Sequence, residues 1–150
     1  MTRGVSIAVA LLIVCIPQIS SAHTRSQSFS SWNARGNEVA TTFNIKARLV
    51  TALRAIESPE PSLGQQLSKH LVNTISLTHN GTPCDLISPP RPVSAESGFT
   101  RVKMRFSCPQ HLGRGVLTIN NDAFFLVAST HLHFARVTSP GRSDPELVFS

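Results

Sequence analysis

The length, composition and charge of the chain fit one small folded domain. Of its 150 residues, 41% are hydrophobic and 15% charged, which supplies a core and excludes a disordered chain. The formal net charge of +6 includes no consecutive basic run, and one Trp and no Tyr offer little for base stacking, so nucleic-acid binding is not indicated. A mild attraction to an anionic membrane surface is compatible with this charge.

Residues 1–22 have the features of a secretory signal peptide. Arg3 precedes an apolar run at residues 5–16, which is too short to anchor the chain in a bilayer, and small residues lead up to Ala22. We therefore expect cleavage after Ala22 and secretion across the inner membrane. Residues 23–150 then form a single domain that is periplasmic, or at least extracytoplasmic.

The cysteines predict one disulfide bond. Cleavage removes Cys15 and leaves Cys84 and Cys108, and an even pair of cysteines in an oxidising compartment normally bonds. The closed loop of about 25 residues would contribute roughly 3 kcal/mol by the loop-entropy model. The alternative is a pair of thiolate metal ligands, although the two cysteines lack the close spacing that such sites prefer.

Alternation of apolar and polar residues predicts most of the strands. They are expected at residues 26–32, 38–47, 73–78, 98–108, 116–119 and 146–150. In the strand at 98–108, Arg101, Lys103 and Arg105 share one face and Val102 lies on the other. The basic face can meet an acidic partner or lipid headgroups, or it can be a solvated face that discourages edge pairing.

A change of period after the second strand predicts two helices. They are expected at residues 48–56 and 62–72, with Ser62 and Gln65 in the positions of a capping box. His70 on the second helix is interpreted as a packed or solvated side chain and not as a ligand. The proline-rich residues 88–97 are expected to form a loop.

These elements together predict a mainly β fold. Several short strands separated by turns, with one helical excursion, are typical of an immunoglobulin-like β-sandwich with a short α-helical insertion. The pattern does not fix the order of the strands.

Residues 123–137 form the longest apolar run after the signal peptide and predict one long central strand. Because side chains alternate, Leu132 and Phe134 share a mostly apolar face that is expected to point into the core. His131 and His133 share the other face and are expected to lie side by side, off the core.

Two neighbouring imidazoles on one strand face can chelate a metal ion. Cleavage after Ala22 would make His23 the N-terminus, which adds a free amine and a third imidazole. His23, His131 and His133 are therefore the expected metal ligands, and such nitrogen-rich sites favour Cu(II) or Ni(II), with Zn not excluded. In the alternative interpretation the histidines are structural.

The exported start at Ala22-His23, the Lys46-Ala47-Arg48 segment and the cysteine pair accompany one specific block, which runs from Asp122 to Arg136 and contains HLHFAR. Together they resemble the extracytoplasmic N-terminal domain of HupE/UreJ-type membrane proteins. That resemblance implies an association with nickel or related metal transport and a following bundle of transmembrane helices. Nothing after Ala22 is long and apolar enough to span a membrane, so the transport half is expected on a separate or missing segment.

Two functions follow from these features. The first is an exported accessory domain that binds Cu or Ni and resembles the N-terminal part of HupE/UreJ-like transporters. The alternative is a metal-free interaction module that docks a membrane protein through the basic stripe or an exposed edge strand. An enzyme is not expected, because no Ser–His–acid set, HExxH motif or phosphate loop is present and no small-molecule substrate is indicated.

Overall fold

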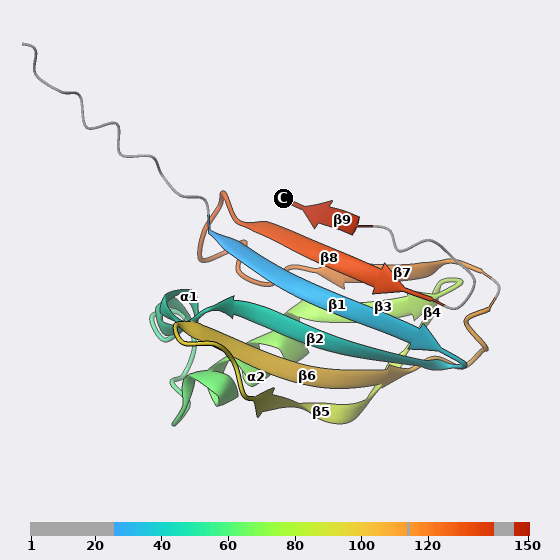
Figure 1. Cartoon of the computed structure of the whole chain (residues 1–150), viewed down its shortest axis with the longest axis horizontal. Coiled ribbons are helices and arrows are strands. Elements are labelled where there is room, and N and C mark those ends of the chain that lie inside the picture. The colour runs from blue at the N-terminus through green and yellow to red at the C-terminus, as the bar shows by residue number, and fades with distance from the viewer. Residues whose placement is uncertain (1–25, 114, 140–145) are drawn as a thin grey trace, which may run out of the picture.

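The computed structural model describes residues 26–113, 115–139 and 146–150, and it is mainly β, as predicted. Two sheets and two helices make up the described chain (Figure 1). The immunoglobulin-like detail stays a prediction. The predicted signal peptide and His23 lie outside the described residues.

The larger sheet has six strands and contains one parallel pair. In spatial order its strands are β5 (Asp85–Val93), β6 (Phe99–Ser107), β2 (Glu38–Lys46), β1 (Gln27–Arg35), β8 (Leu132–Thr138) and β9 (Glu146–Phe149). Neighbours are antiparallel except β1 and β8, which run parallel. The alternating burial of β1, β2 and β6 confirms the predicted strands and gives the sheet one core face and one open face.

The two helices follow β2 and lie at one end and on one face of the large sheet (Figure 1). They are α1 (Ala47–Leu53) and α2 (Leu63–Thr74). The predicted capping box is present, since the Gln65 N–H donates to Ser62 Oγ and the Ser62 N–H donates to Gln65 Oε1.

The smaller sheet completes the second layer. Its order is β4 (Thr82–Pro83), β3 (Ile75–His79) and β7 (Leu117–Asn121), and with α2 it lies behind the six-stranded sheet in Figure 1. Apolar side chains from both layers fill the space between them, among them Phe43, Leu67, Leu77 and Val102. None of the helices in the described part of the chain is long and apolar enough to cross a membrane.

The predicted loop at residues 88–97 is wrong, because β5 occupies most of it. β5 lies at the edge of the large sheet and pairs with β6 alone, so its prolines do not interrupt a ladder on the far side. Register shifts after Leu86 and Ser88 absorb the irregularity that the prolines cause.

The Cys84–Cys108 disulfide is present, as predicted. It joins the residue before β5 to the residue after β6, and Cys108 is buried in the core. The edge strand with the prolines is therefore tied covalently to its neighbour.

The predicted strand at residues 123–137 is correct only in its second half. Residues 123–127 form turns, in which the N–H groups of Val127 and Ala128 both donate to the carbonyl of Phe124. Phe124 is fully buried and has a positive φ of 69°, a backbone conformation that no strand contains. The apolar run therefore reflects a buried turn and not an extended segment.

The predicted faces of this segment are also wrong. His131, His133 and Ala135 are buried, whereas Leu132 and Phe134 are only half-buried and lie on the other side. Phe134 stacks on Phe29 over the open face of the sheet. The prediction depends on residues 123–130 continuing the strand, but β8 begins only at Leu132, so the apolar side chains before it do not indicate which face of β8 is buried.

Candidate functional site

The parallel pairing of β1 with β8 brings two polar patterns together inside the core. Ser28 is opposite His133, and the alternate residues of both strands point inward. Serines two residues apart on β1 and histidines two residues apart on β8 therefore interleave. We call the resulting chain the serine–histidine ladder, which runs in the order Ser26, His131, Ser28, His133, Ser30, Trp32.

Every ring nitrogen of the ladder lies at hydrogen-bond distance from a serine hydroxyl. His131 Nδ1 lies 2.8 Å from Ser26 Oγ, and its Nε2 lies 2.7 Å from Ser28 Oγ. His133 Nδ1 lies 2.6 Å from Ser28 Oγ, and its Nε2 lies 2.8 Å from Ser30 Oγ. Ser28 thus bridges both imidazoles.

Trp32 sets the direction of the ladder, because an indole nitrogen can only donate. Its Nε1 donates to Ser30 Oγ at 2.7 Å, so the Ser30 hydroxyl donates onward to His133 Nε2. The proton of His133 then sits on Nδ1 and is donated to Ser28, whose hydroxyl donates to His131 Nε2. When both imidazoles are neutral, the four groups between Trp32 and Ser26 each donate once and accept once, while Trp32 only donates and Ser26 only accepts within the ladder.

Aromatic rings surround the two imidazoles. The His133 ring stacks on Phe43 with centroids 4.9 Å apart and also contacts Phe149. The His131 ring contacts Phe124 and Phe125. None of the ion pairs among the described residues includes either histidine.

This apolar environment keeps both imidazoles neutral. Burial, and to a smaller extent the neighbouring His131, lower the pKa of His133 to about 3. Burial also lowers the pKa of His131. Both shifts agree with the donor pattern, which requires one acceptor nitrogen on each ring.

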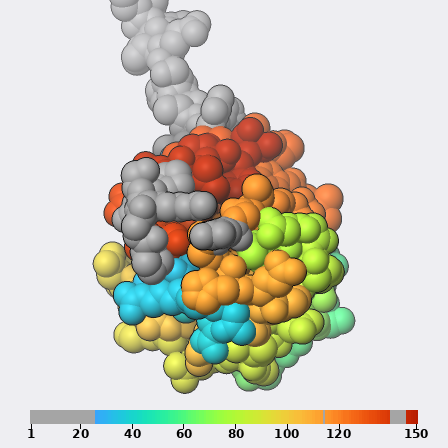
Figure 2. Space-filling model, turned by 90° about the vertical axis from the view of Figure 1, so that its right-hand side faces the viewer, coloured from blue at the N-terminus to red at the C-terminus, as the bar shows by residue number. Residues whose placement is uncertain are grey.

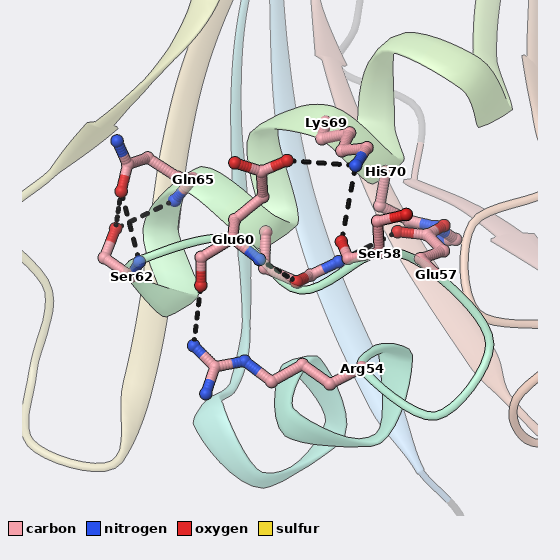
Figure 3. Close-up of polar contacts among 9 residues, drawn as sticks. Arg54, Glu57, Ser58, Glu60, Ser62, Gln65, Lys69 and His70 are labelled. Carbon is pink, nitrogen blue, oxygen red and sulfur yellow. Dashed lines mark hydrogen bonds and ion pairs between the residues drawn. The ribbon is translucent and has the colours of Figure 1, made fainter.

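His70 is also buried, as its packed interpretation predicts, and it contacts Phe124, which contacts His131 of the ladder as well. His70 Nε2 accepts the N–H of Phe124 at 3.2 Å, so its other nitrogen, Nδ1, carries the proton and donates to Glu57 at 2.6 Å. Figure 3 shows Glu57, from the connection between the helices, beside His70 of α2 and near the ion pair of Lys69 with Glu60. Sequence patterns gave no signal for Glu57, which lies thirteen residues earlier in a loop.

The ladder is a poor fit to the expected Cu or Ni site. A metal ion needs an unshared nitrogen lone pair directed at it, and the ring nitrogens of His131 and His133 already face serine hydroxyls. Among the described residues no group of three or more His, Cys, Asp or Glu side chains converges. His23, the third expected ligand, lies outside the described residues, so its proximity to the ladder stays a prediction.

The open face of the large sheet carries a second candidate site, which we call the cationic trough. Its floor consists of small polar side chains and its rims mostly of cationic and aromatic ones. Ser31, Thr42 and Asn44 lie on the floor, Arg91, Arg101, Lys103 and Arg105 on one rim, and Phe29, Phe134 and Arg136 on the other, where the acidic Glu146 lies opposite Arg136. Register explains this shape, because Thr42 lies between Lys103 and Ser31, and Ser31 lies beside Arg136.

The trough contains two hollows. One of about 510 Å³ is bordered by Arg91, Lys103 and Arg105, and one of about 380 Å³ by Arg101, Arg136 and Glu146 with the aromatic pair. Arg105 forms an ion pair with Glu38, and the Arg101 guanidinium donates to the Ser94 carbonyl. Within the described residues, Arg91, Lys103 and Arg136 take part in no ion pair.

Comparison with known proteins adds no assignment. A scan against protein-family models finds no match, and a search of curated proteins finds none. The resemblance to HupE/UreJ-type proteins therefore rests on the quoted residues alone, and function has to be argued from the ladder and the trough.

Proposed function

We propose that this chain is an exported interaction domain that docks the cationic trough against an acidic surface of a membrane protein partner. The trough carries the proposal, because it gathers four basic side chains on one rim and a fifth on the other. Its long side chains surround a low polar floor, so acidic side chains of a partner can enter between the rims and pair with several cations at once.

The shape of the trough favours a protein over a lipid surface. A layer of lipid headgroups is nearly planar and would touch the rims, whereas the two hollows between them match protruding side chains. The exposed Phe29 ring, stacked on Phe134 at a centroid distance of 5.5 Å, provides an apolar anchor beside the charges.

An extracytoplasmic location is part of the proposal. The disulfide is typical of proteins in oxidising compartments, which agrees with the predicted signal peptide at residues 1–22. The resemblance to HupE/UreJ-type domains adds the expectation of a membrane protein as partner. No catalytic step and no resident metal are included, because both ladder imidazoles use their nitrogens in hydrogen bonds.

The proposal is tested with a labelled ten-residue oligoglutamate as a probe for acidic surfaces. Its binding to the mature protein is measured by fluorescence anisotropy at low and at 0.3 M salt. We expect Lys103→Glu to weaken binding at least fivefold at low salt. This side chain is exposed on the rim, and none of the ion pairs among the described residues includes it. High salt should remove most of the difference between the two proteins.

Arg48→Glu is the matched control, since it changes the net charge equally on the exposed surface of α1, away from the trough. It should weaken binding less than twofold. Equal losses in the two variants would mean that only net charge matters and would contradict a docking site. Binding to phosphatidylglycerol vesicles without binding to oligoglutamate would assign the trough to a lipid surface and reject the protein partner.

A further inference from the structure

The two layers leave an apolar groove between β7 and β9, on a different part of the molecule from the trough. The groove has a volume of about 800 Å³. Its main apolar lining comprises Val116, Leu117, Ile119, Val137, Leu147 and Phe149. Figure 2 looks at the end of the molecule where the red C-terminal strands lie above the orange segment that leads into β7.

Side chains on the inner faces of both sheets remain accessible in this groove. Leu147 is 40% exposed although it pairs with Ala135, which is fully buried in the core. Leu117 and Ile119 oppose the buried His79 and Leu77 across the small sheet, yet both are only half-buried. The core is therefore open on this side.

The edge of β7 that borders the groove has unused main-chain groups. The N–H of Asn80 donates to the carbonyl of Val116, so the hydrogen-bonded pairs between β3 and β7 fall on Val116 and every second residue after it. Leu117 and Ile119 consequently direct their N–H and C=O away from β3. No strand pairs with that side of β7 in the described chain.

The outer edge of β9 likewise pairs with no other strand in the part of the chain that the structure describes. The N–H of Leu132 donates to the carbonyl of Ser26, so Leu132 and every second residue after it face β1, while His133 and Ala135 face β9. Their partners on β9 use their groups toward β8, and Val148 directs its N–H and C=O outward. Val148 is 58% exposed.

We propose that the groove accepts an extended segment of a partner protein, which adds a strand to the edge of β7 or β9 and places alternate apolar side chains between the sheets. Two free strand edges border one apolar groove, and an extended peptide satisfies both the main-chain groups and the apolar lining. An acyl chain would fill the groove but leave the N–H and C=O groups of both edges without partners. This inference does not rest on the proposed function of the trough.

The test uses a blocked eight-residue peptide of alternating valine and threonine, with a lysine at each end for solubility. Binding is measured by fluorescence anisotropy, and amide hydrogen exchange is followed by NMR with and without saturating peptide. We expect the amides of Leu117, Ile119 or Val148 to exchange rapidly in the free protein and at least tenfold more slowly with peptide. The Thr118 amide, which already faces β3, should not change.

Leu147→Asn should weaken peptide binding at least fivefold, since this side chain lines the groove. Leu126→Asn is the matched control, because Leu126 is 89% exposed and does not line the groove, and it should have no effect. Circular dichroism checks that both variants fold. A peptide with N-methyl groups on alternate residues, which removes the donors of its pairing edge, should bind at least tenfold more weakly.

Three outcomes would overturn the inference. Equal binding of the N-methylated peptide, or displacement of the peptide by palmitate at a lower concentration than by unlabelled peptide, would assign the groove to a general apolar ligand. Slow exchange of the Leu117, Ile119 and Val148 amides in the free protein would mean that the edges are already paired. Concentration-dependent dimerisation that Leu147→Asn abolishes would make a second copy the occupant.

Discussion

Ser28 links two imidazoles inside a core of aromatic rings. Its hydroxyl oxygen lies 2.6 Å from His133 Nδ1 and 2.7 Å from His131 Nε2. A buried polar atom without a partner costs more free energy than a typical hydrogen bond contributes. Loss of the Ser28 hydroxyl should therefore lower the stability of the fold by more than one hydrogen bond. Every ring nitrogen of the ladder has a hydrogen-bond partner, which explains how two imidazoles remain in the core without an ion pair.

We therefore expect Ser28→Ala to lower the free energy of unfolding by about 2–6 kcal/mol, because two buried ring nitrogens lose their partner at about 1–3 kcal/mol each. Ser31→Ala is the control on the same strand. Ser31 is exposed on the open face, so its loss should change stability by less than about 0.5 kcal/mol. Urea unfolding at pH 7.5 measures both, and equal small effects would show that the ladder contributes little.

At the scale of the elements, sequence period predicted the strands whose two faces differ. β2 and β6 alternate cleanly, and the predicted outward position of Arg101, Lys103 and Arg105 is confirmed, although Arg101 is half-buried. The alternation of apolar and polar residues did not predict strands whose sequence depends on their position in the whole sheet. β5 reads as a loop because its prolines are tolerated only at a sheet edge, and edge position is a property of the whole fold.

Only part of the serine–histidine ladder could be predicted from the sequence, because its other features also depend on how distant strands pair. The shared strand face of His131 and His133 follows from their spacing, but their burial does not, because it depends on the parallel pairing with β1. The alternating serines at 26, 28 and 30 are visible in the sequence. No local pattern connects them to histidines more than one hundred residues away.

The disulfide ties the edge strand β5, whose pairing with β6 contains register shifts, to its neighbour. We expect the double substitution Cys84→Ala and Cys108→Ala to lower the free energy of unfolding by roughly 3 kcal/mol, given the sequence separation of 24 residues. Denaturant unfolding measures the loss. Hydrogen exchange should accelerate more in β6 amides that face β5 than in the β1–β2 hairpin, and uniform acceleration would contradict this local role.

At the scale of the whole molecule, charge and polarity are distributed over three separate regions. The cationic trough occupies the open face of the large sheet, the ladder lies in the core, and the apolar groove opens between the layers. The ladder holds β1 against β8, the one parallel pair among the described strands, and thereby connects the first of these strands to the C-terminal part of the chain. Protonation of the ladder therefore acts on the fold as a whole.

Acid should destabilise the protein through the ladder before most carboxylates titrate. The pKa of His133 is about 3 in the folded protein and about 6.5 in the unfolded chain, so the unfolded chain binds the extra proton between these values. Its contribution to stability is fully present above pH 6.5 and is lost as the pH falls toward 3. Within that window His133 alone should lower the free energy of unfolding by about 1.4 kcal/mol per pH unit.

Urea unfolding between pH 7.5 and 5 measures this slope, and His133→Gln provides the comparison. Glutamine keeps a donor and an acceptor but does not titrate, so the variant should be less stable at pH 7.5 and show a shallower slope below pH 6.5. No charged side chain forms an ion pair with this imidazole in the described structure, and aromatic rings flank it, so no carboxylate offsets its protonation. A slope as steep in the variant as in the original protein would place the acid sensitivity at another group and contradict this prediction.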